Sequence, residues 1–386
     1  MPRLLFLLIV LFSLCLISCG DDDDDNDADD NATDDDATDD DATDDDATDD
    51  DATDDDATDD DLIDDDTTDD DIVDDDTADD DVTDDDTITD DYENPLCKEW
   101  NEDPNWIDDP VNIHCLVEKG EFADPNTPAP ETIRVVDWNI ERGHSLDEYI
   151  DLFQNDPTLS EADVLLLQEV DRYCPRTDDR HVARELAAAL AMDYVYGVEF
   201  IELNQQSGEH GNAVLSRFPI VGAQLLRHTD FEQWYLDADQ PRLGGRMTIA
   251  ADVRIGDKTI RVASAHHSSG VKYYFRAHHT QAGETTDLLA AAAGTVIWGG
   301  DLNTGVWWVL QCEPAIDQIL NQGYADALSD LPRDQNWTMP ADPPAPAMRL
   351  DWIFHRNVDT LGGRVLYEEP YNDLSDHLGI YADFTL

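Results

Sequence analysis

Basic residues are scarce in this chain of 386 residues, which has 22 Lys and Arg against 92 Asp and Glu. Between residues 21 and 91 there is no basic residue, while Asp occurs 43 times. From residue 92 onward, 21 basic residues face 49 acidic ones, a formal net charge of −28. Long nucleic acids are bound mainly by Lys and Arg that neutralise backbone phosphates, so this deficit disfavours a protein built to bind a long polyanion.

The N-terminus lacks an apolar run long enough for a membrane span. Leu4 to Leu16 follows a short basic start and falls short of the roughly 20 residues that a spanning helix needs. Leu16-Ile17-Ser18-Cys19 fits a bacterial lipoprotein box, so we expect residues 1–19 to be a signal peptide ending at a lipidated Cys19. This predicts export and a membrane anchor in the cell envelope, at the outer membrane or cell surface rather than the inner membrane. A plain secretory signal with an incidental Cys19 is the alternative.

Residues 20–95 have few of the apolar side chains that a core requires. A five-residue unit, Ala32-Thr33-Asp34-Asp35-Asp36, repeats through Asp61 and then drifts. Like charges at this density repel, and little apolar surface is available to offset chain entropy, so a disordered Asp-rich tether is expected. A calcium-binding loop is the alternative, but the segment has no glycine-turned loop of the kind that a defined calcium site needs.

Cysteine is also sparse, and no Cys/His cluster has the spacing of a zinc site. Cys97 and Cys115 lie in residues 96–131, a stretch with little core of its own. In an oxidising compartment we expect them to form a disulfide that staples a small cap, followed by a proline-rich linker at residues 125–130. Two free buried thiols are the alternative.

Residues 132–386 carry the pattern of one large folded domain. Apolar runs bounded by turn residues predict strands at 134–138, 162–168, 194–201 and 213–216, and a hairpin formed by 247–253 and 259–264. Strong helix formers predict helices at 144–153, 182–192 and 276–293. Strands and helices do not alternate with a regular βαβ rhythm.

Acid and amide side chains follow several of these apolar runs. They occur in Trp138-Asn139, Gln168-Glu169, Gly300-Asp301-Leu302-Asn303, Leu350-Asp351-Trp352 and Ser375-Asp376-His377. A polar side chain just past a buried strand lies at the rim of the sheet, where functional sites are usually built. The sequence therefore predicts an oxygen-rich pocket with one imidazole. Such oxygen ligands suit Mg²⁺, Mn²⁺ or Ca²⁺ better than zinc.

With the segments Gly211 to Arg217 and Ala265-His266, these motifs stand in the order found in the endonuclease/exonuclease/phosphatase superfamily. The chain resembles this family over about residues 132–386. The family includes pancreatic deoxyribonuclease, abasic-site endonucleases, neutral sphingomyelinases and inositol polyphosphate 5-phosphatases. The resemblance implies an α+β fold, a four-layer α/β/β/α sandwich of two mixed β-sheets flanked by helices. It also implies hydrolysis of a phosphoester bond by metal-assisted attack of water.

The resemblance assigns a divalent metal, Mg²⁺ or else Mn²⁺ or Ca²⁺, to one group of residues. Asn139 and Glu169 would hold it, with Glu141 nearby and Asp376 contributing from the far side. The alternative for Glu169 is a surface carboxylate that merely follows a strand.

The resemblance assigns the chemistry to a second group. Asp301 would orient and deprotonate the attacking water, while Asn303 would hold Asp301 and a phosphoryl oxygen. His377 would lie against the phosphate, oriented by Asp351 as the Asp of a catalytic triad orients its His. His266 would be a second phosphate contact, or else a structural histidine. The assignment of the proton between Asp301 and His377 stays open.

Four further residues belong to this interpretation. In the implied fold the loops after Glu169 and Asp301 leave the same rim, so Cys174 and Cys312 are predicted to form a second disulfide. Asp137 stands where the family usually has a small polar residue, and His267 replaces a usual apolar one.

The function predicted on these grounds is an exported, lipid-anchored, metal-dependent phosphoesterase, expected to be a monomer. A compact phosphoester or a membrane headgroup is favoured as substrate, because the basic residues are scattered without a basic run. A secreted or surface deoxyribonuclease is the alternative, since nucleic acid stays possible. In another class, the alternatives are a catalytically inactive binding module or an acidic surface spacer.

Overall fold

The computed structural model describes residues 117–386, apart from residues 230–231, 233, 237–239, 270–273, 306–312, 342 and 344–345. The predicted signal peptide, the predicted tether and most of the predicted cap lie outside the described residues. So do Cys19, Cys97, Cys115 and Cys312. Within the described ranges, none of the helices is long and apolar enough to cross a membrane.

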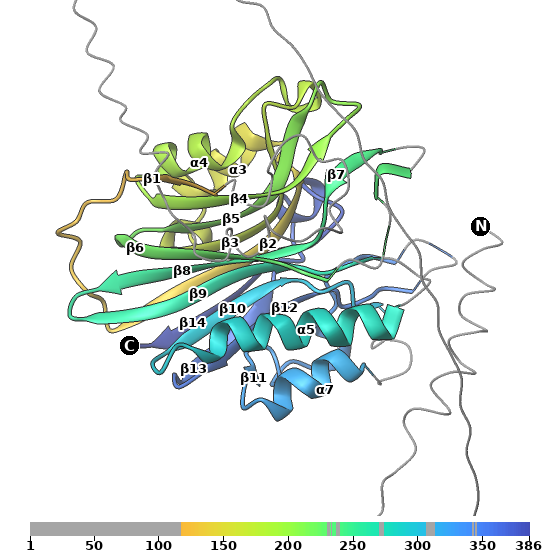
Figure 1. Ribbon diagram of the computed structural model, residues 1–386. Helices are drawn as coiled ribbons and strands as arrows, with labels where there is room; N and C mark the ends of the chain where they lie inside the picture. The colour runs from red at the N-terminus through yellow and green to blue at the C-terminus, as the bar shows by residue number, and fades with distance from the viewer. Residues whose placement is uncertain are drawn as a thin grey trace, which may run out of the picture. The chain divides into compact units, whose positions relative to one another are not determined.

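Two mixed β-sheets pack face to face (Figure 1). In sheet A the described strands are ordered β1-β4-β5-β3-β2-β14-β13, and β7 also pairs with β4. Their bounds are β1 (Val117–Gly120), β2 (Thr132–Arg142), β3 (Val164–Arg172), β4 (Asp193–Glu202), β5 (Gly208–Ser216), β7 (Arg242–Gly244), β13 (Thr360–Val365) and β14 (Ile380–Thr385).

In sheet B the described strands are ordered β11-β12-β10-β9-β8-β6. Their bounds are β6 (Ile220–Arg227), β8 (Met247–Ile255), β9 (Lys258–His266), β10 (Val296–Asp301), β11 (Ala325–Asp326) and β12 (Asp351–Arg356). The pairs β2–β3 and β9–β10 are parallel, whereas the other neighbours in both sheets run antiparallel.

The strands are apolar along their length because both faces of each sheet are covered. On β3, Val164 and Leu166 face the core between the sheets, while Leu165 and Leu167 face the helices on the outside. Successive side chains of a strand point to opposite faces, so a strand buried on both sides reads as a continuous apolar run. This explains why the run at 162–168 could be identified from the sequence.

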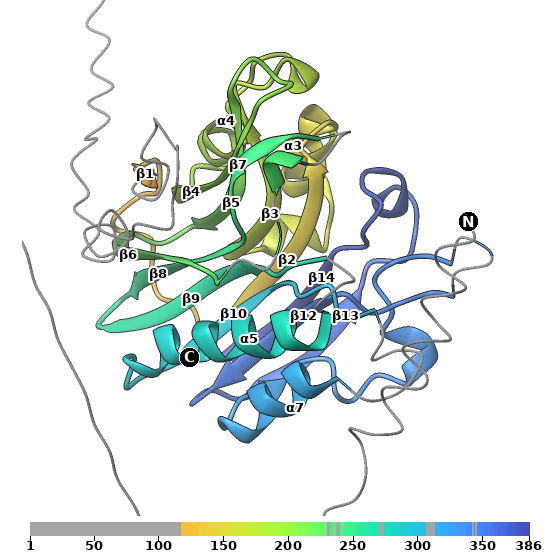
Figure 2. The same ribbon diagram turned by 45° about the vertical axis from the view of Figure 1, so that its right-hand side comes forward.

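Helices close the two outer faces (Figures 1 and 2). Sheet A is covered by α3 (Leu146–Asn155) and α4 (Val182–Leu190), and sheet B by α5 (Tyr274–Ala290) and α7 (Pro314–Asn321). The shorter 3-10 turns are η2 (Leu159–Glu161), η3 (Pro175–Thr177), η4 (Trp234–Leu236), η5 (Arg333–Gln335) and η6 (Tyr371–Asp373). The resulting α/β/β/α order confirms the predicted four-layer sandwich.

The predicted helices and strands lie where α3, α4, α5 and the central strands are found, with shifts at their ends. Two differences bear on the site. β2 and β3 continue to Arg142 and Arg172, several residues past the predicted strand ends, and both contain a bulge there. In addition, β1 falls in the span predicted as a cap and linker, yet it pairs with β4, so residues 117–120 belong to sheet A.

Candidate active site

The strand register of sheet B brings three predicted site residues together. Asp301 ends β10, and its neighbours across the sheet are His266 on β9 and Asp351 on β12. The two glycines before Asp301 permit this close packing. A side chain at Gly300 would meet the Ala265 carbonyl oxygen at 1.8 Å, far inside van der Waals contact. The Gly-Gly-Asp sequence thus serves to seat Asp301 between two strands.

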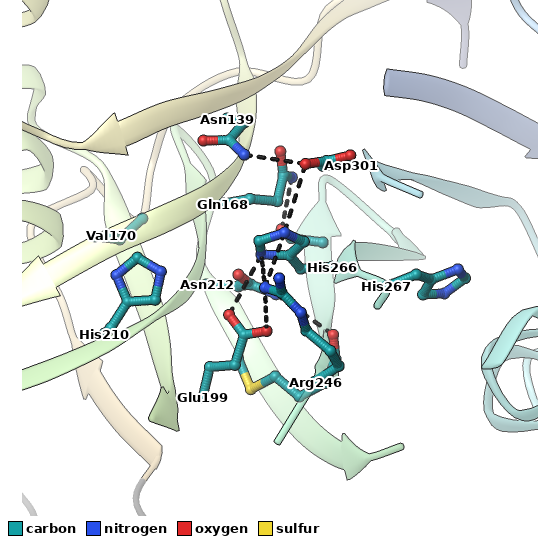
Figure 3. A network of polar contacts seen from close by, with 12 residues as sticks. Asn139, Gln168, Val170, Glu199, His210, Asn212, Arg246, His266, His267 and Asp301 are labelled. Carbon is teal, nitrogen blue, oxygen red and sulfur yellow. Dashed lines mark hydrogen bonds and ion pairs between the residues drawn. The ribbon is translucent and has the colours of Figure 1, made fainter. Parts of the chain in front are cut away.

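The Asp301 carboxylate is the point on which the site converges (Figure 3). Its Oδ2 accepts a hydrogen bond of 3.1 Å from Asn139 Nδ2 and lies 3.4 Å from His266 Nε2 and 3.7 Å from His377 Nε2. Burial by itself would raise the pKa of Asp301, but the nearby His377 and His266 imidazoles lower it well below its ordinary value. Asp301 is therefore ionised throughout the physiological range.

His377 is held by a second carboxylate. Its Nδ1 lies 2.8 Å from Asp351 Oδ2, and because a carboxylate only accepts hydrogen bonds, Nδ1 carries a proton and donates it. This turns Nε2 toward Asp301. Burial would lower the pKa of His377, but Asp351 and Asp301 outweigh it and raise that pKa well above the ordinary value. Asp351, whose backbone N–H donates to Thr338 Oγ1, is itself fully buried.

The segment before β14 is tied to β2, which fixes the place of His377. Ser375 Oγ donates to the Asn139 carbonyl at 2.7 Å and accepts from the His377 backbone N–H at 3.1 Å. Trp138 Nε1 donates to the His377 carbonyl at 3.1 Å. The Trp138-Asn139 and Ser375-Asp376-His377 motifs, more than 230 residues apart, therefore support each other directly.

His266 lies in a buried charge network that the sequence analysis did not find. Its Nδ1 is 3.3 Å from Glu199 Oε2, and Arg246 Nη1 lies 2.8 Å from Nδ1 and 2.9 Å from Nε2. Arg246 also pairs with Glu199 at 2.9 Å. Burial and Arg246 would lower the pKa of His266, but Glu199 and Asp301 raise it. A glutamate inside the apolar strand 194–201 was the available signal, because a buried charge requires a partner.

The four predicted metal ligands lie at the ends of β2 and β3 and before β14. Glu169 and Glu141 have left-handed φ angles of 53° and 45°, a conformation that costs a non-glycine residue energy and often marks functional sites. The Glu169 carboxylate makes no hydrogen bond or ion pair with another described residue. Burial would raise its pKa, but His210, His266 and two arginines lower it. The exposed Asp376 has its Oδ1 3.4 Å from Ser375 Oγ, whose hydrogen is directed to the closer Asn139 carbonyl.

Among the described residues, one set of three His, Cys, Asp or Glu side chains has its ligand atoms within 4.8 Å of one another, namely Asp301, Asp351 and His377. This buried set could hold a divalent cation. The 2.8 Å bond between His377 and Asp351 places a proton between two of its members, however, and a cation would have to displace that proton. The roles of Glu169, Asn139, Glu141 and Asp376 as ligands stay a prediction.

Asn303 supports Asp301 through its backbone. Its N–H donates to Asp301 Oδ1 at 2.9 Å, in a left-handed conformation with φ of 53°. The side-chain amide donates to the His267 carbonyl at 2.9 Å. The His267 imidazole is fully buried, 3.3 Å from Thr285 Oγ1, and burial holds its pKa well below the ordinary value. His267 is therefore a neutral histidine beside the site, and it points away from Asp301 (Figure 3).

A polar column joins the two sheets beneath the site. Gln168 Nε2 donates to Asp137 Oδ1 and to Ser264 Oγ, both at 2.9 Å, and Ser264 Oγ donates to the Leu167 carbonyl at 2.9 Å. Burial and the charge of Asp351 raise the pKa of Asp137 well above its ordinary value. The extra carboxyl at position 137 is thus a neutral group in the core rather than an additional charge near the pocket.

The predicted disulfide between Cys174 and Cys312 is contradicted by the state of Cys174, while Cys312 lies outside the described residues. Cys174 is a free, buried thiol, and its Sγ lies 3.4 Å from the Glu209 carbonyl. It packs beneath Gly208 at the start of β5, where a side chain at that glycine would meet the sulfur at 2.7 Å. The side chain thus faces the interior of sheet A, and burial raises the pKa of its thiol.

Known proteins share this fold. The model of the Endonuclease/Exonuclease/phosphatase family matches residues 138–377. An endonuclease/exonuclease/phosphatase from Beutenbergia cavernae DSM 12333 is 21% identical with a TM-score of 0.51, over 67% of this chain and 72% of that chain. The human Nocturnin catalytic domain, solved with a bound sulfate anion, is 18% identical with a TM-score of 0.50, over 70% and 97%. A search of curated proteins found no match.

The family match begins at Trp138 and ends at His377, the two residues whose hydrogen bond closes the site. It spans more than half of the chain and includes Asp301 with its neighbours. Members of the family hydrolyse phosphoesters, as phosphoesterases or nucleases, which supports hydrolase activity on phosphoesters here. The chain belongs to the endonuclease/exonuclease/phosphatase family.

Proposed function

We propose that this chain is an exported, lipid-anchored phosphoesterase that depends on a divalent metal and acts on a small-molecule or phospholipid-type phosphoester. The observation that carries the proposal is the Asp301 carboxylate, which faces His377, His266 and Asn139. Hydrolysis needs one group that takes a proton from water and another that gives a proton to the leaving oxygen. An ionised carboxylate 3.7 Å from a protonated imidazole meets both needs.

The charge states favour one direction of proton transfer. Asp301 has a lowered pKa and is ready to accept a proton, while His377 has a raised pKa and carries one on Nε2. The oxygen of water forms a bond to phosphorus as its proton passes to Asp301. The bond from phosphorus to the leaving oxygen breaks, and that oxygen takes the proton from His377 Nε2. Asp351 keeps the Nδ1 proton in place throughout.

The donor chemistry at the ends of β2 and β3 fits a divalent metal. Glu169 is ionised and lacks a partner among the described residues, and Asn139 offers Oδ1, which accepts one hydrogen bond of 3.1 Å from the Glu141 backbone N–H. Glu169 and Asn139, with Glu141 and Asp376, would hold the ion. When bound, it would supply positive charge to the phosphoryl oxygens, where negative charge develops during hydrolysis.

Ion pairing among the described residues favours a compact substrate. Ten of the seventeen arginines among the described residues have a carboxylate partner within 4.0 Å, namely Arg134, Arg142, Arg172, Arg176, Arg180, Arg217, Arg242, Arg246, Arg261 and Arg349. An arginine paired with a carboxylate contributes little to a phosphate backbone, and long nucleic acids need several such contacts. A single phosphoester needs only the site itself.

The setting of the enzyme completes the proposal. Cys19 would be lipidated and would anchor a monomer to the cell envelope. An Asp-rich tether of about 75 residues would place the catalytic domain roughly 50 Å from the membrane by the square-root rule for flexible chains, and further if charge extends it. The acidic composition of residues 20–95 and the lipoprotein box support this arrangement.

A substrate panel tests the proposal. The purified full chain should be assayed on soluble phosphomonoesters and phosphodiesters, phospholipid vesicles and plasmid DNA, each with Mg²⁺, Mn²⁺ or Ca²⁺ at matched salt. Turnover of soluble or lipid phosphoesters that Asp301→Asn abolishes would support it. Efficient nicking of plasmid at physiological salt, without turnover of the others, would establish the deoxyribonuclease alternative. Full activity after verified removal of the metal would refute metal dependence.

A further inference from the structure

Exposed apolar side chains gather at one end of sheet A. In the described part of the chain, seven large hydrophobic side chains are exposed, and four of them lie at this end. They are Tyr173, Leu203, Tyr235 and Leu236, with exposed fractions of 54, 44, 54 and 64%. Single exposed apolar residues are ordinary, whereas a group on adjoining segments indicates a contact surface. We call these four residues the apolar rim.

Two members of the rim, Tyr173 and Leu203, follow strands that both pair with β5. Tyr173 comes directly after β3, whose last residue pairs with Glu209 on β5. Leu203 comes directly after β4, whose last residue pairs with Gly208. The Leu203 backbone N–H also donates to the carbonyl of Pro241, the residue before β7, at 3.0 Å. Figures 1 and 2 both show β7 running beside the far end of β4.

Tyr235 and Leu236 lie on a turn that a buried tryptophan anchors. They belong to η4, whose first residue, Trp234, is buried against β4 and β7. The Arg242 guanidinium lies 4.6 Å from the Trp234 ring and 4.1 Å from the Phe200 ring, and the two rings are 5.2 Å apart. This stacking holds the turn while its next two side chains remain in solvent.

The rim lies next to the active site. Arg246 lies 5.1 Å from the Trp234 ring on one side and contacts His266 at 2.8 Å on the other. His266 in turn lies 3.4 Å from Asp301. Only Arg246 and His266 therefore separate the base of η4 from the carboxylate at the centre of the site.

The charges around the rim are paired. Arg172 contacts Glu209 and Glu118, Arg176 contacts Asp171 at 2.6 Å, and Arg242 lies 3.8 Å from Glu202. Three arginines thus face four carboxylates and leave no excess of positive charge at the rim, on a protein whose residues from 92 onward carry a formal charge of −28. An anionic lipid surface would repel such a protein, whereas a zwitterionic surface would not. Tyrosine and leucine also suit the boundary between headgroups and acyl chains.

We propose that the apolar rim docks this protein onto a zwitterionic phospholipid surface, with Tyr235 and Leu236 entering the boundary between headgroups and acyl chains. Docking there brings the phosphoester of a headgroup to the side of the molecule that holds Asp301. The choice of a phospholipid as substrate rests on the proposed phosphoesterase function. The docking surface itself does not.

Vesicle binding tests the docking surface. All variants would carry Cys19→Ser in the full chain, so that lipidation does not anchor the protein and any contribution of the N-terminus is common to all. Binding to phosphatidylcholine vesicles would be measured by co-sedimentation for the parent and for Tyr235→Ser/Leu236→Ser. Losing two apolar side chains from the interface should weaken partitioning about tenfold or more. Phosphatidylglycerol vesicles should bind the parent more weakly than phosphatidylcholine vesicles do.

Leu361→Ser is the matched control, because Leu361 is 62% exposed and lies on β13 at the opposite edge of sheet A. It should bind like the parent, and thermal unfolding should show that the double variant is folded. Equal vesicle binding by the double variant and the parent would overturn the proposal. So would a concentration-dependent dimer that only the double variant loses, because a second copy would then cover the rim.

A second readout separates this proposal from the catalytic one. The ratio of lipid-vesicle turnover to soluble-phosphoester turnover should fall about tenfold in Tyr235→Ser/Leu236→Ser. An unchanged ratio would contradict the proposed docking surface without contradicting the phosphoesterase function. If no phosphoester is hydrolysed but the double variant still loses vesicle binding, the proposed function fails and the docking surface stands.

Discussion

Two histidines reach the Asp301 carboxylate from different sheets, and each has a second carboxylate behind it. His377, on the segment that leads into β14 of sheet A, donates Nδ1–H to Asp351 at 2.8 Å. His266, at the end of β9 in sheet B, has Nδ1 3.3 Å from Glu199, with Arg246 packed against its ring. The sheet A side thus resembles the His–Asp pair of a catalytic triad, while the sheet B side is a network of four charged groups.

The difference lies in how freely each imidazole can exchange a proton. His377 is held by two carboxylates, which raise its pKa well above the ordinary value. His266 has two carboxylates as well, but the Arg246 guanidinium opposes their effect on its pKa. We infer that His377 is the proton donor and that His266 mainly orders Asp301 and the adjacent charges. The same residue type therefore takes different roles because its neighbours differ.

The largest expected loss of turnover comes from changing Asp301, whose Oδ2 faces both histidines. Asp301→Asn keeps the shape of the side chain but removes the charge that accepts the proton from water, so turnover should fall by about 10³-fold or more. The kcat on a soluble phosphodiester would be measured, with thermal unfolding as the check on folding. A variant that keeps more than about a tenth of parent activity would contradict the assignment of Asp301 as base.

Removal of the metal should lower turnover by a similar factor, because neither histidine can take over the role of the ion. Glu169→Ala removes an ionised carboxylate that has no described protein partner, and it should abolish most turnover while leaving the fold intact. Excess chelator should do the same to the parent, and added Mg²⁺ should restore activity. Titration calorimetry would show weaker Mg²⁺ binding by the variant. Unaltered binding and turnover would exclude Glu169 as a ligand.

The two histidines should then be separated by substitution. His377→Ala should lower kcat by a factor on the order of 10² or more, through the lost proton donor. Since His266 faces the same oxygen, the combined His266→Ala/His377→Ala loss should be smaller than the product of the two single losses. If the loss in kcat of the double variant equals the product of the two single losses, the two histidines act independently.

The pH profile offers a smaller but sharper distinction. His377 must be protonated to donate, so activity should fall as pH rises through its raised pKa. Asp351→Asn removes the carboxylate that does most to raise that pKa and should move the alkaline fall in activity to lower pH by about one unit. Glu199→Gln, on the His266 side, should move it much less. An equal shift in both variants would contradict the assignment of His377 as donor.

The raised pKa of His377 also predicts how the free energy of unfolding depends on pH. The folded pKa of His377 lies above the value near 6.5 expected for an unfolded chain. Its ion pairs therefore contribute stability that is fully present below about pH 6.5 and is lost as pH rises through the folded pKa. Asp351→Asn should reduce this loss between neutral and alkaline pH. Chemical denaturation at two pH values would measure it, with Glu199→Gln as the comparison variant.

The sequence by itself determined the family, the sandwich and the order of the site motifs. Apolar runs such as 162–168 can be recognised in the sequence because β3 is buried on both faces. Polar residues directly after such runs mark the edge of the sheet where the site lies. Asn139, Asp301, Asp351 and His377 were named on this basis and His266 through the family resemblance, and the fold brings them together. The ligand set around Glu169 and the N-terminal segments stay predictions.

Only the tertiary structure decided which side chains support these residues. Glu199 and Arg246 meet across 47 positions of sequence, and no local pattern specifies such a pairing. The direction of Cys174 after β3 depends on its packing against Gly208 and Glu209 at the start of β5, so proximity of loops was not enough to predict a disulfide. The apolar rim likewise depends on β3 and β4 ending, and β7 beginning, at one end of sheet A. Periodicity records which face of an element is buried, but the partners across that face are set by packing between segments far apart in the chain.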